Sequence, residues 1–200
     1  MPLLKPITLD TSRLILRPLQ QDDAASLFAI WSDPLAMRYF SFVPMTSVAQ
    51  AEERVERRIS GTADGASIAC TLVSRQTGEA LGDLSLFNVN EPCLRAEIGF
   101  SLQRRHWGNG YMFEAAARLV DHAFDAFGLR RIEADIDPRN QASANLLERL
   151  GFKREGLLRE RWRVGDEVSD SALYGLLESE RRVPLTSPVA APFPPATTRH

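Results

Sequence analysis

The segment RRHWGNGYMFEAAARL, residues 104–119, is the most informative part of this sequence. Arg104 and Arg105 come first, and Gly108 and Gly110 then lead directly into a helical pattern. Glycines in front of a helix let the backbone approach a ligand closely, because no Cβ stands in the way. The free N–H groups of the first helical turn form an anion site, most naturally for phosphate. We therefore predict a pyrophosphate cradle with two arginines at its rim, although the spacing also fits an ordinary tight strand-to-helix loop.

The common nucleotide-binding motifs do not fit this segment. No Lys-Ser or Lys-Thr pair follows the glycines, which excludes a Walker P-loop. A third glycine at the Rossmann spacing is missing, and the preceding strand belongs to a run of short β segments rather than to a βαβ unit. The cradle is therefore expected in a different fold.

Hydrophobic spacing predicts an α/β (α+β) fold in which a mixed, mostly antiparallel sheet carries helices on both faces. Adjacent β segments joined by short turns indicate antiparallel pairing. Helical spacing, with caps at Ser47 and Asn140, predicts helices at 20–34, 48–59, 111–127 and 141–150. The expected strands are 13–19, 67–74, 81–89, 95–102, 131–136, 157–164 and 167–177.

Composition excludes several function classes. The chain has 200 residues, is 44% hydrophobic and carries a net charge of −2, so no basic field indicates a nucleic-acid partner. No segment reaches the length of a membrane span and the N-terminus does not resemble a signal peptide, so we expect a cytoplasmic protein without a membrane partner. Cys70 and Cys93 form no CxxC motif and are interpreted as reduced, buried side chains. The histidines form no cluster that predicts a metal site.

The C-terminus has a distinct composition. Residues 184–198 contain five prolines among Ser, Thr and Ala. Such a segment cannot pack a regular element against a core. We therefore expect one folded domain at 1–180 and a Pro-rich, disordered tail at 181–200.

The segment RRHWGNGY, with its flanking blocks, resembles the GNAT acyltransferase superfamily. In the acetyl-CoA pyrophosphate loop of that family, an Arg or Gln is followed by two residues of any type and then by Gly-x-Gly or Gly-x-Ala. Arg105, Gly108 and Gly110 match this pattern in register. Four further blocks resemble the family in order and distance: TSRLILRPLQQDDAASLFAIWSDP, AEIGFSL, DPRNQASANLLERLGFKREG and SDSALYGLL. The likeness covers residues 8–178 and is closest to the RimJ/RimL-type branch of ribosomal-protein N-terminal acetyltransferases.

The resemblance implies that acetyl-CoA is the co-substrate and that its acetyl group passes to a primary amine. The pantetheine arm would bond to the strand before the loop, and a backbone N–H of that strand would stabilise the thioester oxygen as it gains negative charge. The implied cofactor-binding residues are Phe100, Ser101, Leu102, Arg104, Arg105, Trp107, Gly108, Asn109, Gly110, Tyr111, Asn140 and Ser143.

Two residues are candidates for proton transfer. Glu97 is the implied general base, since an ammonium must lose its proton before it attacks; the alternative is an outward-facing strand carboxylate. Many relatives use a tyrosine as acid where this chain has Leu147, whereas the RimL-type branch places a serine where Ser143 stands. The alternative for Ser143 is an ordinary serine in a first helical turn. Asn140 either caps its helix or contacts the pantetheine amide, and we favour the contact.

The acceptor is the least defined part of the prediction. Trp31, Met37 and Tyr39 fall where this branch lines the acceptor cleft, although such side chains are more often core. The resemblance favours an N-acetyltransferase, monomeric or homodimeric, whose acceptor is a protein N-terminal amine or a small amine. The alternative is a non-catalytic CoA-binding module or sensor of the same fold. The missing tyrosine favours the module, whereas the presence of both Glu97 and Ser143 favours the enzyme.

Overall fold

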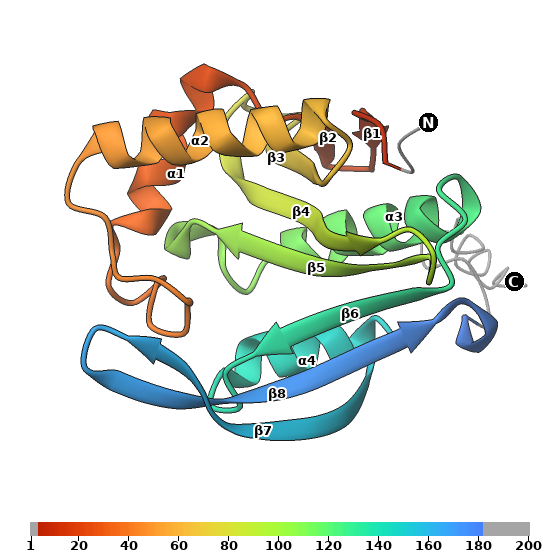
Figure 1. The fold of residues 1–200 in the computed structure, drawn as a ribbon. Coiled ribbons are helices and arrows are strands. Elements are labelled where there is room, and N and C mark those ends of the chain that lie inside the picture. Colours follow the sequence, from red (N-terminus) through yellow and green to blue (C-terminus); the bar gives the residue numbers. More distant parts are fainter. Residues whose placement is uncertain (1–3, 182–200) are drawn as a thin grey trace, which may run out of the picture.

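The protein is built around an eight-stranded sheet in the order β1-β2-β3-β4-β5-β6-β8-β7, in a computed structural model that describes residues 4–181 (Figure 1). Every neighbouring pair of strands is antiparallel except β5 and β6, which are parallel. The predicted mixed, mostly antiparallel sheet is confirmed. The strands are β1 (Leu9–Asp10), β2 (Leu14–Pro18), β3 (Ile68–Ser74), β4 (Ala80–Asn90), β5 (Arg95–Leu102), β6 (Arg131–Ile136), β7 (Lys153–Val164) and β8 (Glu167–Leu177).

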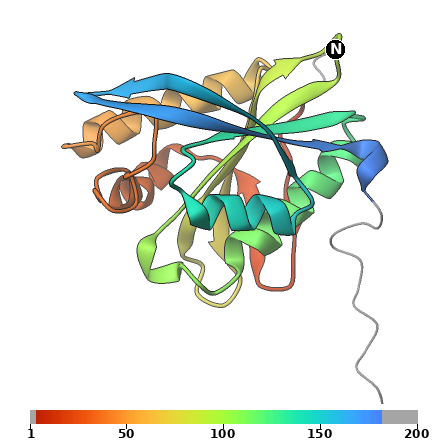
Figure 2. The same cartoon turned by 90° about the horizontal axis from the view of Figure 1, so that it is seen from below.

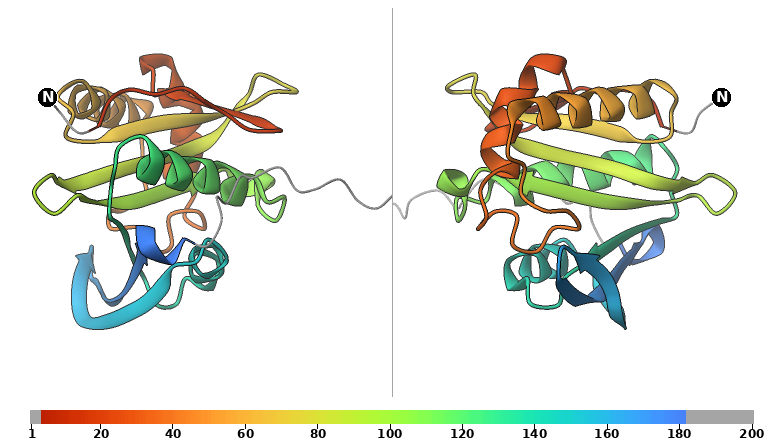
Figure 3. Two further views of the ribbon diagram at one scale, coloured as in Figure 1. Left: turned by 90° about the vertical axis from the view of Figure 1, so that its right-hand side faces the viewer. Right: turned by 60° about the vertical axis from the view of Figure 1, so that its left-hand side comes forward.

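The helices cover both faces of the sheet, as predicted. Helices α1 (Ala24–Trp31) and α2 (Val48–Ala63) lie on one face, and α3 (Tyr111–Asp125) and α4 (Gln141–Arg149) lie on the other (Figures 1 and 3). Each face has its own buried cluster of apolar side chains, one formed with α1 and α2 and a larger one formed with α3 and α4. Short 3₁₀ turns lie at Gln21–Asp23, Arg104–His106 and Glu178–Glu180.

Helix α3 packs against the sheet along a side that includes several small residues. Ala115, Ala116 and Ala117 are almost completely buried. The predicted apolar stripe is confirmed at Met112, Ala116, Leu119, Val120 and Ala123. This packing fixes the start of α3 relative to the end of β5, where the glycine segment lies.

Several boundaries differ from the sequence prediction. The prediction missed β1, which has only two residues and therefore no periodic pattern. It placed the start of β7 at 157, but β7 begins at Lys153; most of its side chains are exposed, so no apolar alternation marks its first residues. Helix α1 begins at Ala24, after a 3₁₀ turn that the pattern could not distinguish from the helix.

The prediction for the two cysteines was half right. Cys70 is buried in β3, and desolvation raises the pKa of its thiol to about 12. Cys93 is exposed in the turn between β4 and β5, so the prediction that it is buried was wrong. The predicted tail at 181–200 lies outside the described residues except for Arg181, which makes ion pairs with Asp121 and Asp125 of α3.

Candidate active site

The sheet opens between its two parallel strands. β5 and β6 pair from Arg95 and Arg131 as far as Glu97 and Glu133, and the pairing stops there although both strands continue (Figure 1). On the other side of β5, the N–H of Gln103 donates to the carbonyl of Leu81 at 2.9 Å. Because backbone groups alternate along an antiparallel strand, those of Ile98, Phe100 and Leu102 point toward the β6 side. The backbone of β5 therefore faces the opening with groups that a bound chain can pair with.

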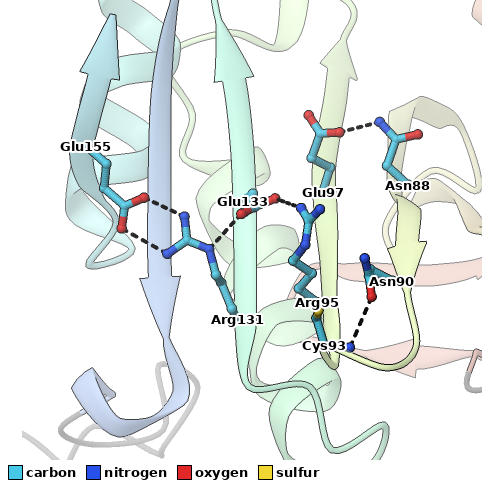
Figure 4. A network of polar contacts seen from close by, with 8 residues as sticks. All are labelled: Asn88, Asn90, Cys93, Arg95, Glu97, Arg131, Glu133 and Glu155. Carbon is cyan, nitrogen blue, oxygen red and sulfur yellow. Dashed lines mark hydrogen bonds and ion pairs between the residues drawn. The ribbon is translucent and has the colours of Figure 1, made fainter.

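Ion pairs join the strands at the closed end of this opening (Figure 4). Glu133 pairs with Arg95 of β5 and, at 2.7 Å, with Arg131 of its own strand, while Arg131 also binds Glu155 of β7. The hydrogen bonds that Arg131 donates to Glu155 raise the pKa of Arg131 and lower the pKa of Glu155. The Arg131 guanidinium crosses β8 over Gly175, where a Cβ would come within 2.7 Å of its Nη2. The ion pairs thus link β5 and β6 across β8 to β7.

The opening leads into a cavity of about 850 Å³. One wall comes from the segment between α1 and α2, and the opposite wall from the hairpin of β7 and β8. Figure 2 shows the tip of that hairpin over this segment, where Arg38 and Glu167 make an ion pair at 3.4 Å. The predicted site residues brought together in this cavity are Trp31, Met37, Tyr39, Glu97, Phe100, Ser101, Asn140 and Ser143.

Glu97 lies on the cavity face of β5, at the point where the pairing with β6 stops. Ala96 and Ile98 point into the core, so alternation places the Glu97 side chain on the opposite face with Gly99 and Ser101. The side-chain amide of Asn88 donates a hydrogen bond to its carboxylate (Figure 4). No pattern in the sequence indicates this role for Asn88, because Asn88 lies at an irregularity in the pairing of β4 with β5 and has a positive φ of 49°.

Helix α4 presents Ser143 and Asn140 to the same cavity. The side-chain oxygen of Asn140 accepts a hydrogen bond from the N–H of Ser143 at 3.1 Å, so Asn140 caps the helix. Of the two roles predicted for Asn140, the structure therefore contains the cap, which is not the favoured one. The cap uses only the amide oxygen of Asn140. A contact between its amide nitrogen and the pantetheine arm stays a prediction. Leu147 is completely buried in the core one turn further along, at the position where many relatives have a tyrosine.

The predicted acceptor residues differ in their exposure. Trp31 and Met37 are only 1% and 3% exposed and belong to the buried cluster of α1 and α2, as the core alternative requires. Tyr39 is 37% exposed, and the guanidinium carbon of Arg139 lies 5.8 Å from its ring centre. Of the three, Tyr39 is therefore the side chain best placed to contact a ligand in the cavity.

The glycine segment forms a second part of the site, outside the cavity lining. Gly108 and Gly110 both adopt the left-handed conformation, with φ of 76° and 75°. Gly110 is the N-cap of α3, and no side chain of the described residues bonds the N–H groups of the first turn as a cap. A Cβ on Gly108 would meet no atom within 4 Å, so this backbone is open to an incoming group. The arrangement fits a phosphate anion.

The side chains around this loop hold it in shape. Arg104 pairs with Asp33 at 2.8 Å and Arg105 pairs with Glu79, so both predicted rim arginines already have acidic partners. The indole N–H of Trp107 donates to the carbonyl of Leu102 at 2.8 Å, which ties this side chain to the end of β5. Asn109 bonds the carbonyls of two preceding loop residues through its amide nitrogen.

Arg13 is a loop contact that sequence reasoning missed. It donates to the carbonyl of Asn109 at 2.9 Å, pairs with Glu114 at 2.6 Å, and lies with its guanidinium carbon 4.5 Å from the ring centre of Tyr111. Nearly a hundred residues separate Arg13 from the loop, so no local pattern could indicate the contact.

Two global properties bear on the site. In the part of the chain that the structure describes, no group of three or more His, Cys, Asp or Glu side chains could hold a metal ion. The same part contains no helix with the length and apolarity needed to cross a membrane.

Comparison with known proteins agrees with this geometry. A family model for the acetyltransferase (GNAT) domain matches residues 13–153. An uncharacterized N-acetyltransferase, p20 of Bacillus licheniformis, is 35% identical over 173 residues, which cover 86% of this chain and 97% of that protein. The crystal structure of Mycobacterium smegmatis RimJ in complex with CoA-disulfide matches with a TM-score of 0.77 at 26% identity and covers 86% of each chain. A spermidine N-acetyltransferase from Vibrio cholerae, in complex with CoA and spermine, shares the fold with a TM-score of 0.75 at 24% identity.

The fold and the family match together define an acetyltransferase. The chain belongs to the GNAT acetyltransferase family, in its RimJ/RimL-type branch, and is an N-acetyltransferase. The resemblance stated from the sequence is therefore confirmed, and the non-catalytic module is the less favoured of the two alternatives.

Proposed function

We propose that this N-acetyltransferase takes its acetyl group from acetyl-CoA and transfers it by direct attack to a primary amine bound in the cavity. The acceptor is a protein N-terminal amine or a small amine. The observation that carries the proposal is the end of the β5–β6 pairing at Glu97, because the opening there leads into the cavity that contains Glu97 and Ser143. Donor and acceptor can meet at that point from opposite faces of the sheet.

The donor would be held by backbone groups. The N–H groups at the start of α3 would bind the pyrophosphate, and the β6-facing groups of Phe100 and Leu102 would pair with the pantetheine arm. Acetyl-CoA supplies the acetyl group in activated form, as a thioester. An N–H of β5 at the opening is suited to stabilise negative charge that develops on the acyl oxygen.

Glu97 and Ser143 would manage the protons. The Glu97 carboxylate, oriented by Asn88, accepts a proton from the acceptor ammonium, directly or through water, so that the nitrogen lone pair is free to attack. The Ser143 hydroxyl lines the cavity and is available to donate a proton to the departing thiolate. The two groups lie on different elements, β5 and α4, and line the same cavity.

Thiol release from acetyl-CoA tests the proposal directly. The wild-type protein is assayed with a panel of alkyl amines and of peptides that begin with Ala or Ser, and mass spectrometry locates the added acetyl group. Amine-dependent release with acetylation of the amine nitrogen is expected. Tight CoA binding without release on any amine would contradict the proposal and would favour the binding module.

A matched pair of variants tests the residue roles. Glu97→Gln is expected to lower kcat strongly with little change in CoA affinity, whereas Glu56→Gln on the exposed side of α2 leaves both unchanged. Equal kcat in the two variants would remove Glu97 from the mechanism.

A further inference from the structure

The α2 wall of the cavity carries three arginines, of which one lacks an acidic partner. Arg58 makes an ion pair with Asp83 at 2.7 Å, and Arg57 lies 4.0 Å from Glu53 of the preceding turn. Within residues 4–181, Arg54 makes no ion pair, and its Nε is buried without any hydrogen-bond partner. A buried guanidinium nitrogen without an acceptor is costly, so the Nε of Arg54 has a hydrogen bond left to donate to a ligand.

Aromatic rings hold Arg54 but do not satisfy it. Its guanidinium carbon lies 4.1 Å from the ring centre of Phe42 and 5.4 Å from that of Trp31. This stacking fixes the guanidinium, yet a ring face offers no acceptor in the plane of the N–H groups. Desolvation, together with the positive charge of Arg58, lowers the pKa of Arg54, although an arginine remains protonated at neutral pH. The Asp83 carboxylate acts in the opposite sense, but its ion pair is with Arg58, so Arg54 presents to the cavity a positive charge without an ion-pair partner of its own among the side chains that the structure describes.

The acidic side chains of the cavity have other partners. Asp83 is used by Arg58 and Ser101, Glu97 by Asn88, and Asp135 by Ser171. Arg139 binds both remaining acids of the cavity, Asp137 and Glu167. An anion for Arg54 would therefore have to come from outside these residues.

We propose that the acceptor amine carries a carboxylate, and that Arg54 binds this group on the α2 wall of the cavity while the amine lies at the β5–β6 opening. This inference rests on the proposed function. Of the three arginines on α2, Arg54 is the one without an ion pair in the described residues, and one such guanidinium suits a single negative charge. Helix α2 lies on the face of the sheet opposite α3, so the anion is not the pyrophosphate expected at the start of α3 (Figure 3). A polyamine, whose charges are all positive, is disfavoured beside Arg54.

The test compares acids with their own amides. A series of ω-amino carboxylates of increasing length is assayed by thiol release beside the matching ω-amino amides, which keep the amine and lose the charge. We expect a higher kcat/KM for the acid of suitable length. Arg54→Gln is expected to lower kcat/KM about 10- to 100-fold for that acid and to leave the amide nearly unchanged, as loss of a charge-assisted bond requires. Arg54→Lys keeps the positive charge but loses the paired N–H donors of the guanidinium. Its kcat/KM for the acid should therefore lie between the values of the wild-type protein and of Arg54→Gln.

Controls separate this inference from folding and from the proposed function. Arg159→Gln removes an exposed arginine outside the cavity lining and should change kcat/KM neither for the acid nor for the amide. If Arg54→Gln has a low Tm, the comparison of kcat/KM for the acid and the amide in the wild-type protein still tests whether the site prefers a carboxylate. Calorimetry of the CoA-loaded protein with the N-acetylated acid and the N-acetylated amide needs no turnover. Preferential binding of the acid without activity would support the inference and refute the proposed function, whereas equal binding and equal turnover of acid and amide would overturn the inference alone.

Discussion

The glycine segment allows an experiment in which backbone strain and ligand contact are separated. Gly108 and Gly128 lie before and after α3, with φ of 76° and 66°, and a Cβ on either would meet no atom within 4 Å. Replacement by alanine therefore imposes the same left-handed strain at both positions, about 1–2 kcal/mol, without a clash in either case. Only Gly108 lies where the pyrophosphate is expected.

The magnitudes follow from that difference. For a chain of this size each kcal/mol lowers Tm by about 2–4 °C, so both variants should melt about 2–8 °C below the wild-type protein. In Gly108→Ala the added methyl group also stands between the backbone and the phosphates. Loss of one charge-assisted hydrogen bond costs about 1.5–3 kcal/mol, which corresponds to a CoA affinity about 10- to 100-fold weaker. Gly128→Ala should bind CoA as the wild-type protein does.

Isothermal titration with CoA, run beside thermal unfolding of the same samples, measures both quantities. Titration at a temperature well below either Tm keeps every sample folded, so a difference in Kd reports on the site. If Gly108→Ala and Gly128→Ala bind CoA equally well, the backbone of the glycine segment does not approach the diphosphate and the reasoning is wrong.

Three other predictions address individual side chains. Glu97→Gln should lower kcat about 100-fold or more, with the largest effect at low pH where the acceptor is mostly protonated; a pH profile parallel to that of the wild-type protein would contradict this. Asn140→Ala should lower the free energy of unfolding by about 0.5–2 kcal/mol, measured by urea unfolding, because the helix loses its cap. Asn140→Asp keeps the cap, so it should weaken only CoA binding, measured by calorimetry. Burial alone would raise the pKa of Glu114, but hydrogen bonds from Thr11, Arg13 and Ser12 hold it below its ordinary value of 4.5. Glu114→Gln should therefore be destabilised at neutral pH, and the difference from the wild-type protein should vanish as the pH falls below that value, in urea unfolding from about pH 3 to about pH 7.

Local patterns were sufficient to predict the frame of the donor site. The glycines before α3 and the alternation through β5 each depend on residues a few positions apart, and the structure places both as predicted. The cap at Asn140 also follows from a short-range pattern, although the pantetheine contact is the interpretation that we favour from the sequence. Alternation also put Glu97 on the same face as Ser101, which is the face that lines the cavity. These features follow from backbone geometry, which sequence spacing encodes directly.

Contacts between distant segments could not be predicted in this way. Asn88 reaches Glu97 at an irregularity in the pairing of β4 with β5. Arg13 contacts the glycine segment although it lies 96 residues before Asn109 in the sequence. Arg54 is one of several charged residues on an amphipathic helix, and nothing in that pattern distinguishes it from its neighbours. Its isolation from acidic partners depends on where β4 and the segment after α1 come to lie.

This division has a consequence for specificity. The proposed donor half of the site consists mainly of main-chain groups at a helix start and at a strand opening. The proposed acceptor half is lined by side chains from separate elements, with Tyr39 before α2, Arg54 on α2 and Trp162 on β7. A few substitutions in that wall can change the charge offered to the acceptor while the strands and the glycine segment stay as they are. A shared fold with the spermidine N-acetyltransferase of Vibrio cholerae is therefore compatible with a different acceptor, and the charge at position 54 is where the difference should be sought first.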